Sequence, residues 1–178
     1  YNDAADSLKY VEPVLYDQLV ELNEEMKIVF NDAGHILGSA ITELWVTEND
    51  NVSKIVFSGD LGVMDRPILR NPTIIKKADY VIMETTYGNR LHPANSMDVK
   101  ALMDIIRDTA AKGGTTVIPS FAVGRPQELI YELNRVYETD NEYRRDFDNI
   151  MVYVDSPMAT TATEVFKRKF WLRIESLV

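Results

Sequence analysis

Cysteine is absent from the 178 residues of this sequence, and only two histidines are present, His35 and His92. The lack of cysteine excludes disulfides and thiolate metal sites, so a bound zinc ion would need imidazole or carboxylate ligands. No apolar run approaches the length of a transmembrane helix, and the first residues are polar and acidic, unlike a signal peptide. The two histidines therefore carry most of the information about a metal site.

Positive charge is also scarce, with 19 lysines and arginines against 28 acidic residues and a formal net charge of -9. An acidic chain is a poor general binder of nucleic acid, which argues against a protein that simply coats RNA. A nuclease whose phosphate contacts are local stays compatible with this charge. Hydrophobic residues make up 46%, enough for one ordinary domain or for two incomplete ones.

Five short apolar runs, each followed by polar or small residues, predict buried strands. These runs cover residues 26–30, 54–57, 80–83, 115–118 and 150–154. Turn-rich residues 23–25 and 48–51 predict hairpins, so the first half is expected to be mostly antiparallel, after a short helix near residues 3–8.

The second half has a different pattern, in which helices alternate with the later apolar runs. Helical spacing of apolar residues predicts helices over residues 95–111, 126–137 and 160–170. Strand–helix–strand alternation favours parallel pairing, so this half is expected to form a parallel α/β sheet.

His35 and Asp60 each follow a predicted strand and are the first candidates for chemistry. Gly34 and Gly38 free the backbone around His35, so its imidazole can be directed into a cleft. The plainer alternatives are a surface-loop histidine and an aspartate that closes a turn. One imidazole and one carboxylate also leave a divalent metal ion with too few ligands.

Glu84 ends the third predicted strand, where a carboxylate can orient a catalytic histidine or transfer protons. Its plainer alternative is a carboxylate that accepts hydrogen bonds from amides of its own loop. His92, directly before Pro93, is interpreted as a loop residue rather than a ligand.

Residues 119–126 join a predicted strand to a predicted helix. Gly124 frees the backbone, Pro126 suits the first helical position, and Arg125 beside a helix N-terminus suits a phosphate group. A helix start with an exposed arginine is an equal alternative. Ser156, before Pro157, is expected to cap the last helix.

Five segments, in this order, resemble successive motifs of the beta-CASP branch of the metallo-β-lactamase superfamily. They are DAGHILGSA (residues 32–40), FSGDLG (57–62), ETTYG (84–88), PSFAVGR (119–125) and VDSPMA (154–159). The resemblance covers nearly the whole chain. It points to RNA-processing nucleases similar to the mRNA 3′-end cleavage subunit and its bacterial and archaeal homologues.

The resemblance implies an α/β fold in two parts. Residues 1–90 would be the C-terminal portion of the first metallo-β-lactamase segment, part of an αββα sandwich of mostly antiparallel strands. Residues 91–178 would be the N-terminal portion of the inserted beta-CASP domain, with its parallel sheet.

The resemblance also implies an activity, the zinc-dependent hydrolysis of RNA phosphodiester bonds by a cytoplasmic enzyme that binds two zinc ions. His35 and Asp60 match metal ligands, with Asp60 between the two ions, and Asp60 and Glu84 match catalytic residues. The expected contacts to RNA phosphates are made by Ser120, Gly124, Arg125 and Ser156.

The sequence departs from the family in lacking the His-x-His-x-Asp-His motif and the later histidine motifs. We therefore expect an internal fragment that is inactive alone and that exposes apolar core, which favours self-association. RNA is the expected partner of the parent enzyme, and no membrane is expected. Two alternatives stay open: a non-catalytic scaffold or RNA-binding homologue, and a small-molecule hydrolase of the same superfamily.

Overall fold

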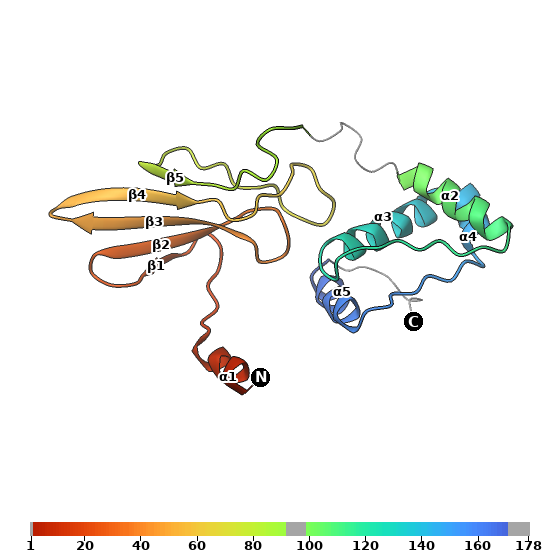
Figure 1. The fold of residues 1–178 in the computed structure, drawn as a ribbon, viewed down its shortest axis with the longest axis horizontal. Helices are drawn as coiled ribbons and strands as arrows, with labels where there is room; N and C mark the ends of the chain where they lie inside the picture. Colours follow the sequence, from red (N-terminus) through yellow and green to blue (C-terminus); the bar gives the residue numbers. More distant parts are fainter. Residues whose placement is uncertain (1, 92–98, 171–178) are drawn as a thin grey trace. The chain divides into compact units, whose positions relative to one another are not determined.

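The computed structural model describes residues 2–91 and 99–170 (Figure 1). The chain divides into two compact units, Tyr1–Thr86 and Tyr87–Val178, which we call the sheet unit and the helical unit. The division falls a few residues before the boundary expected after residue 90. Among the described residues, no helix combines the length and the apolar composition needed to cross a membrane.

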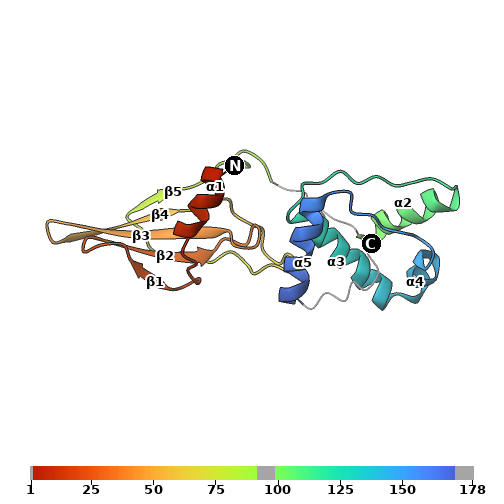
Figure 2. The same cartoon turned by 90° about the horizontal axis from the view of Figure 1, so that it is seen from below.

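The sheet unit opens with a short helix and then forms one five-stranded sheet (Figures 1 and 2). Its elements are α1 (Asn2–Ser7), the 3-10 helix η1 (Leu8–Tyr10), β1 (Leu19–Glu21), β2 (Met26–Asp32), β3 (Ala40–Glu48), β4 (Asn51–Phe57) and β5 (Tyr80–Ile82). The strands lie in sequence order, antiparallel from β1 to β4, and β5 pairs parallel to β4. The expectation of a mixed α/β chain with a mostly antiparallel first half is confirmed.

The turn between β3 and β4 sets the register of the central hairpin. Asn49 and Asp50 have positive φ angles of 48° and 65°, as a two-residue turn that matches strand twist requires. Glu48 consequently faces Asn51, and the pairing continues to Thr42 opposite Phe57. Since side chains alternate along a strand, this register decides which ones face the core.

The fully buried apolar side chains of the sheet unit lie together on one face of the sheet. Buried Ala33, Ile41 and Val56 form the core on this face, and three residues of the β4–β5 connection pack on them: Leu61, Ile75 and Ala78. The register puts Phe57, Tyr80 and Ile82 on the opposite face, where they are 37%, 62% and 56% exposed. The sheet unit therefore keeps apolar side chains in contact with water, as expected.

The described part of the helical unit consists of four helices. They are α2 (Val99–Ala111), α3 (Arg125–Thr139), α4 (Asn141–Phe147) and α5 (Pro157–Phe170). Met103 of α2, Val136 of α3 and Tyr143 of α4 are buried together and form the core, with Val99, Leu133 and Phe147 around them. Three of these helices correspond to the three predicted from apolar spacing, except that residues 95–98 lie outside the described part.

The predicted strands at residues 115–118 and 150–154 are absent from the described structure, so this part of the prediction is wrong. Both segments run without strand pairing, and Val117, Met151 and Tyr153 are 81%, 75% and 69% exposed. A strand needs a neighbouring strand to accept its hydrogen bonds, and apolar composition alone does not reveal whether that neighbour is present.

Candidate functional site

Three loops that carry motif residues leave the sheet at the same end. β2 and β4 are both antiparallel to β3, and β5 is parallel to β4, so these three strands run in one direction. Their carboxyl ends therefore lie together, and they lead to His35, Asp60 and Glu84. This is the convergence that the sequence predicts.

The loop after β2 is closed by its own polar groups. The Gly34 amide donates to Asp32 Oδ1 at 2.8 Å, and the His35 amide donates to Ser39 Oγ at 3.1 Å. Gly34 has a φ angle of 64°, and a Cβ there would lie 2.7 Å from Pro72 Cδ. The backbone that carries the half-buried His35 is thus fixed from both sides.

The loop after β4 packs directly on the backbone of that first loop. The Gly62 amide donates to the Ala33 carbonyl oxygen at 2.8 Å. A Cβ on Gly62 would stand 1.7 Å from the Gly34 carbonyl oxygen and 2.7 Å from the His35 amide nitrogen. Only glycine fits this contact, which fixes the loop of Asp60 against the loop of His35.

The loop after β5 is tied to the loop after β4 through Ser58 and Glu84. The Glu84 amide donates to the buried Ser58 Oγ at 3.0 Å, and the Leu61 amide donates to Glu84 Oε1 at 2.7 Å. The Thr86 hydroxyl donates to Glu84 Oε2 at 2.8 Å. One carboxylate thereby holds the residue that follows Asp60.

The ionisation of Glu84 reflects these bonds. The pKa of Glu84 is lowered chiefly by the Leu61 amide and then by the Thr86 hydroxyl, while partial burial opposes them. His35 is near enough to lower this pKa further through its charge. The carboxylate of Glu84 is therefore negative at neutral pH and faces a loop with an imidazole.

The metal-binding potential of these residues is limited. In residues 2–91 and 99–170, no group of three or more His, Asp or Glu side chains is arranged to hold a metal ion. Asp60 is exposed in its loop, and His92 lies outside the described residues. Because a zinc site needs three or four protein ligands, the residues present do not complete one.

The helical unit links two other predicted residues, Gly124 at the start of α3 and Ser156 at the start of α5. The Gly124 amide donates to Gln127 Oε1 at 2.7 Å. Gln127 Nε2 lies within hydrogen-bonding distance of the Ala159 carbonyl oxygen at 3.3 Å and of Thr163 Oγ1 at 3.1 Å. Gln127 is fully buried, so this one side chain joins the two helix starts.

The remaining residues predicted to contact phosphate differ in their surroundings and partners. Ser156 caps α5, because its Oγ accepts from the Ala159 amide at 3.2 Å. Arg125 at the start of α3 pairs with Glu128 at 3.0 Å. Ser120 is exposed in the segment before α3.

Sequence reasoning missed the side chains that hold the loops. Ser58 and Gln127 lie inside the recognised motifs or next to them, yet neither was singled out, because their partners are distant in sequence. Gly62 stood only as the last residue of the FSGDLG motif. Burial of a polar residue beside a motif is the signal that a structure adds.

No family model matches the chain, but individual proteins do. It is 32% identical to ribonuclease TTHA0252 of Thermus thermophilus over 93% of the chain and 36% of that protein. It is 37% identical to transcription termination factor FttA of Methanosarcina mazei over 72% of the chain and 20% of that protein. It is 31% identical to cleavage and polyadenylation specificity factor subunit 3-I of Arabidopsis thaliana, over 93% and 23%. The chain thus spans little more than a third of these relatives, or less.

Proposed function

From the premise that the chain belongs to the beta-CASP branch of the metallo-β-lactamase superfamily, we propose that it is the middle portion of a metal-dependent ribonuclease. The parent protein hydrolyses RNA phosphodiester bonds in the cytoplasm. The observation that carries this proposal is the convergence of three motif loops, tied by the Gly62, Leu61 and Glu84 amides.

The roles proposed for individual residues follow from their positions. His35 and Asp60 are metal ligands. Asp60 also takes part in catalysis, because it would hold the metal at the place where the RNA phosphodiester is hydrolysed. Glu84 is a second catalytic residue of the same site. The carboxylate of Glu84 is ionised and accepts a hydrogen bond from the Leu61 amide. These two properties support the role, because they allow Glu84 to orient the residues around Asp60.

The metal ion of the parent is proposed to be zinc, with two ions in the complete enzyme. The described residues supply too few ligands for it, so no catalytic step can be assigned to a metal in this chain. The other ligands are proposed to lie in those parts of the parent protein that correspond to the regions of the relatives outside the match to this chain. The chain by itself is therefore proposed to be inactive.

The helical unit is proposed to bind RNA. Residues 91–178 would belong to the beta-CASP domain and residues 1–90 to the metallo-β-lactamase segment. The shared location of the α3 and α5 starts supports phosphate contacts by Gly124, Arg125 and Ser156, since helix N-termini favour anions. Ser120 is included as the motif residue before them. The exposed apolar face of the sheet supports self-association of the isolated chain.

The test compares metal content and cleavage. Elemental analysis of the purified 178-residue chain should give well under one zinc per chain. The full-length protein should hold zinc and cleave a labelled RNA, and His35→Ala or Asp60→Ala should slow cleavage by about 100-fold or more. Asp108→Ala, an exposed aspartate of α2, is the matched control with unchanged cleavage.

Two outcomes would contradict the proposal. Close to two zinc ions in the isolated chain would mean that ligands come from unassigned residues or from a second chain. A full-length protein that binds RNA without cleaving it would favour the scaffold alternative, for which the incomplete ligand set is the supporting observation.

A further inference from the structure

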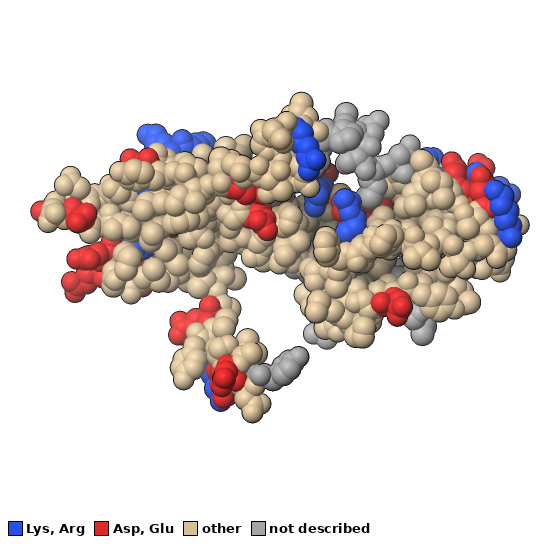
Figure 3. All heavy atoms as spheres, in the orientation of Figure 1, with Lys and Arg blue, Asp and Glu red and all other residues tan. Residues whose placement is uncertain are grey.

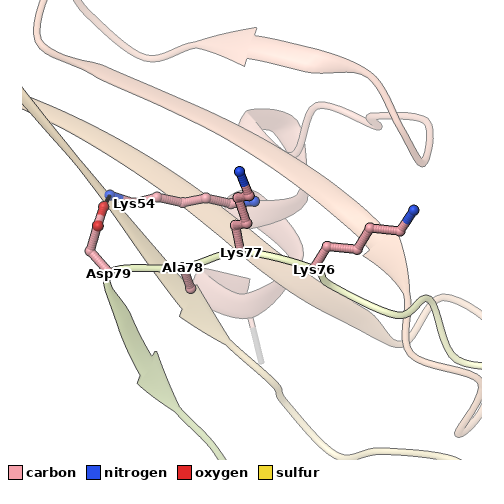
Figure 4. Close-up of a pocket in the computed structure, with 5 residues that line it drawn as sticks. All are labelled: Lys54, Lys76, Lys77, Ala78 and Asp79. Carbon is pink, nitrogen blue, oxygen red and sulfur yellow. Dashed lines mark hydrogen bonds between the residues drawn. The ribbon is translucent and has the colours of Figure 1, made fainter.

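A lysine-lined hollow lies at the end of the β4–β5 pair away from the motif loops. It has a volume of about 510 Å³ and is lined by Lys54, Lys76, Lys77, Ala78 and Asp79 (Figure 4). The Asp79 amide bonds to the Lys54 carbonyl oxygen at the start of β5, whereas the loops of Asp60 and Glu84 follow the ends of both strands. Roughly 13 Å of strand separates the two places.

Lys54 and Asp79 form a fixed wall of this hollow. The Lys54 ammonium pairs with the buried Glu43 and lies 5.1 Å from the centre of the Trp45 ring. Asn31 Nδ2 donates to the other Glu43 oxygen at 2.8 Å, which holds that carboxylate in place. Asp79 Oδ2 accepts from the Lys54 amide at 2.7 Å, which fixes the position of this carboxylate, and the lining carries three lysines against it.

Lys76 and Lys77 differ from most lysines of this acidic chain. In the described part of the chain, neither makes a hydrogen bond or an ion pair, and both are exposed. The other lysines with described side chains have a carboxylate partner, except Lys112: Lys9, Lys27, Lys54, Lys100 and Lys167. Lys112 lies after α2 and is not among the residues that line this hollow.

The backbone under the two lysines is well anchored. Ile75 on one side and Ala78 on the other pack against the sheet core, so the intervening residues have a fixed base. Figure 3 shows basic atoms along the segment that leads into β5, in a unit whose other visible charges are mostly acidic. In the described part of the chain these two ammonium groups have no paired carboxylate, although the Asp79 carboxylate lines the same hollow.

We propose that this hollow binds phosphate groups of an RNA strand, at a place separate from the motif loops. The amine-rich lining suits a hydrated anion better than an apolar ligand, and lysine binds phosphate as a point charge. The choice of RNA as the polyanion rests on the proposed function. The surrounding acidic surface would confine the strand to this basic strip.

The first test measures binding of a short single-stranded RNA to the 178-residue chain by fluorescence anisotropy, without added metal. The Lys76→Gln/Lys77→Gln variant should bind about tenfold or more weakly at low salt. The salt dependence, plotted as log K against log salt, should lose about 1.4 of its slope, roughly 0.7 for each lost contact. Lys112→Gln should behave as the unchanged chain does.

Equal binding by the double variant and by Lys112→Gln would overturn the proposal, as would no RNA binding by the unchanged chain. Circular dichroism melts should show that both variants keep the fold, since all three lysines are exposed.

The second test uses pyrophosphate alone and follows the backbone amides of residues 76–79 by NMR. These amides should shift in the unchanged chain and not in the double variant. If pyrophosphate shifts these amides but the double variant binds RNA as tightly as the unchanged chain does, RNA is not the ligand of the hollow. Neither test uses cleavage or metal, so a failure of the proposed function would appear separately.

Discussion

The sheet unit and the helical unit hold their motif loops in different ways. In the sheet unit, main-chain groups meet directly, as where Gly62 touches the peptide between Gly34 and His35. In the helical unit, one buried side chain, Gln127, reaches across to α5. The first arrangement depends on the absence of a side chain, and the second depends on the presence of one.

This difference has a consequence for tolerance to substitution. A main-chain contact closed by glycine leaves no room for adjustment, because the carbonyl oxygen beside it belongs to the neighbouring loop. A side-chain bridge can be replaced by a residue of similar volume at the loss of its hydrogen bonds. The sheet unit should therefore respond more strongly to the smallest change.

The largest expected effect is that of Gly62→Ala. The new Cβ would stand 1.7 Å from the Gly34 oxygen, so the loops must separate, at a cost of about 3 kcal/mol or more. Urea unfolding followed by Trp45 fluorescence, in a Trp171→Phe background, measures it.

Gly38→Ala is the control for that change, because a Cβ added to Gly38 meets no atom within 4 Å; unlike Gly62, Gly38 has a positive φ angle, 86°. It should cost about 1 kcal/mol, through backbone conformation alone. Equal losses for the two variants would contradict the importance of the close contact.

The next effect is that of Gln127→Met, which keeps the volume but removes the bridge between α3 and α5. We expect a loss of about 2 kcal/mol, because buried donors and acceptors lose partners. Thermal unfolding followed by helical circular dichroism measures it.

Two controls sharpen the comparison. Gln18→Met changes the chain's other glutamine, which is exposed, and should leave stability within about 0.5 kcal/mol. The Trp45 transition of the sheet unit should not move in the Gln127 variant. A common shift of both transitions would mean that the two units do not unfold separately.

A smaller effect is expected for Ser58→Ala, which removes the acceptor of the Glu84 amide. The cost should be about 1 kcal/mol, since water can replace part of the bond. Hydrogen exchange of the Glu84 amide should accelerate, whereas Ser53→Ala, in the middle of β4, should leave it unchanged. If the Glu84 amide exchanges at an unchanged rate in both variants, Ser58 does not link the two loops.

The smallest effect concerns acid. The pKa of Glu84 is lower in the folded chain than in the unfolded chain, so its contribution to stability is present above about pH 4.3. That contribution is lost as the pH falls through the lowered, folded-state pKa. Glu84→Gln should therefore reduce the acid sensitivity of unfolding, whereas Glu138→Gln, exposed at the end of α3, should not. If the free energy of unfolding depends on pH identically in the two variants, the Leu61 and Thr86 bonds do not lower the pKa of Glu84 as inferred.

The sequence predicted the parts of this fold that depend on local pattern. Asn49 and Asp50 indicated the turn that pairs β3 with β4, and the strand ends indicated where the motif loops meet. Helical spacing indicated three of the helices in the second half.

What the sequence did not predict depends on distant partners. Gln127 is an ordinary helix residue until Thr163 approaches it, and Ser58 gains its role only when β5 pairs with β4. Residues 115–118 have the composition of a strand, but in the described structure no neighbouring strand accepts their hydrogen bonds. Local composition contains no information about these partners.

The parallel pairing of β5 with β4 has a consequence for the order of folding. β1 to β4 join through short turns, whereas β5 arrives only after residues 58–79 have closed a long loop, which costs chain entropy before any contact repays it. The bonds of Ser58 and Leu61 to Glu84 form with that step. We therefore expect the hairpins to fold first and the motif loops to assemble last, so that a partly folded chain would contain β1 to β4 without β5 and without the candidate site.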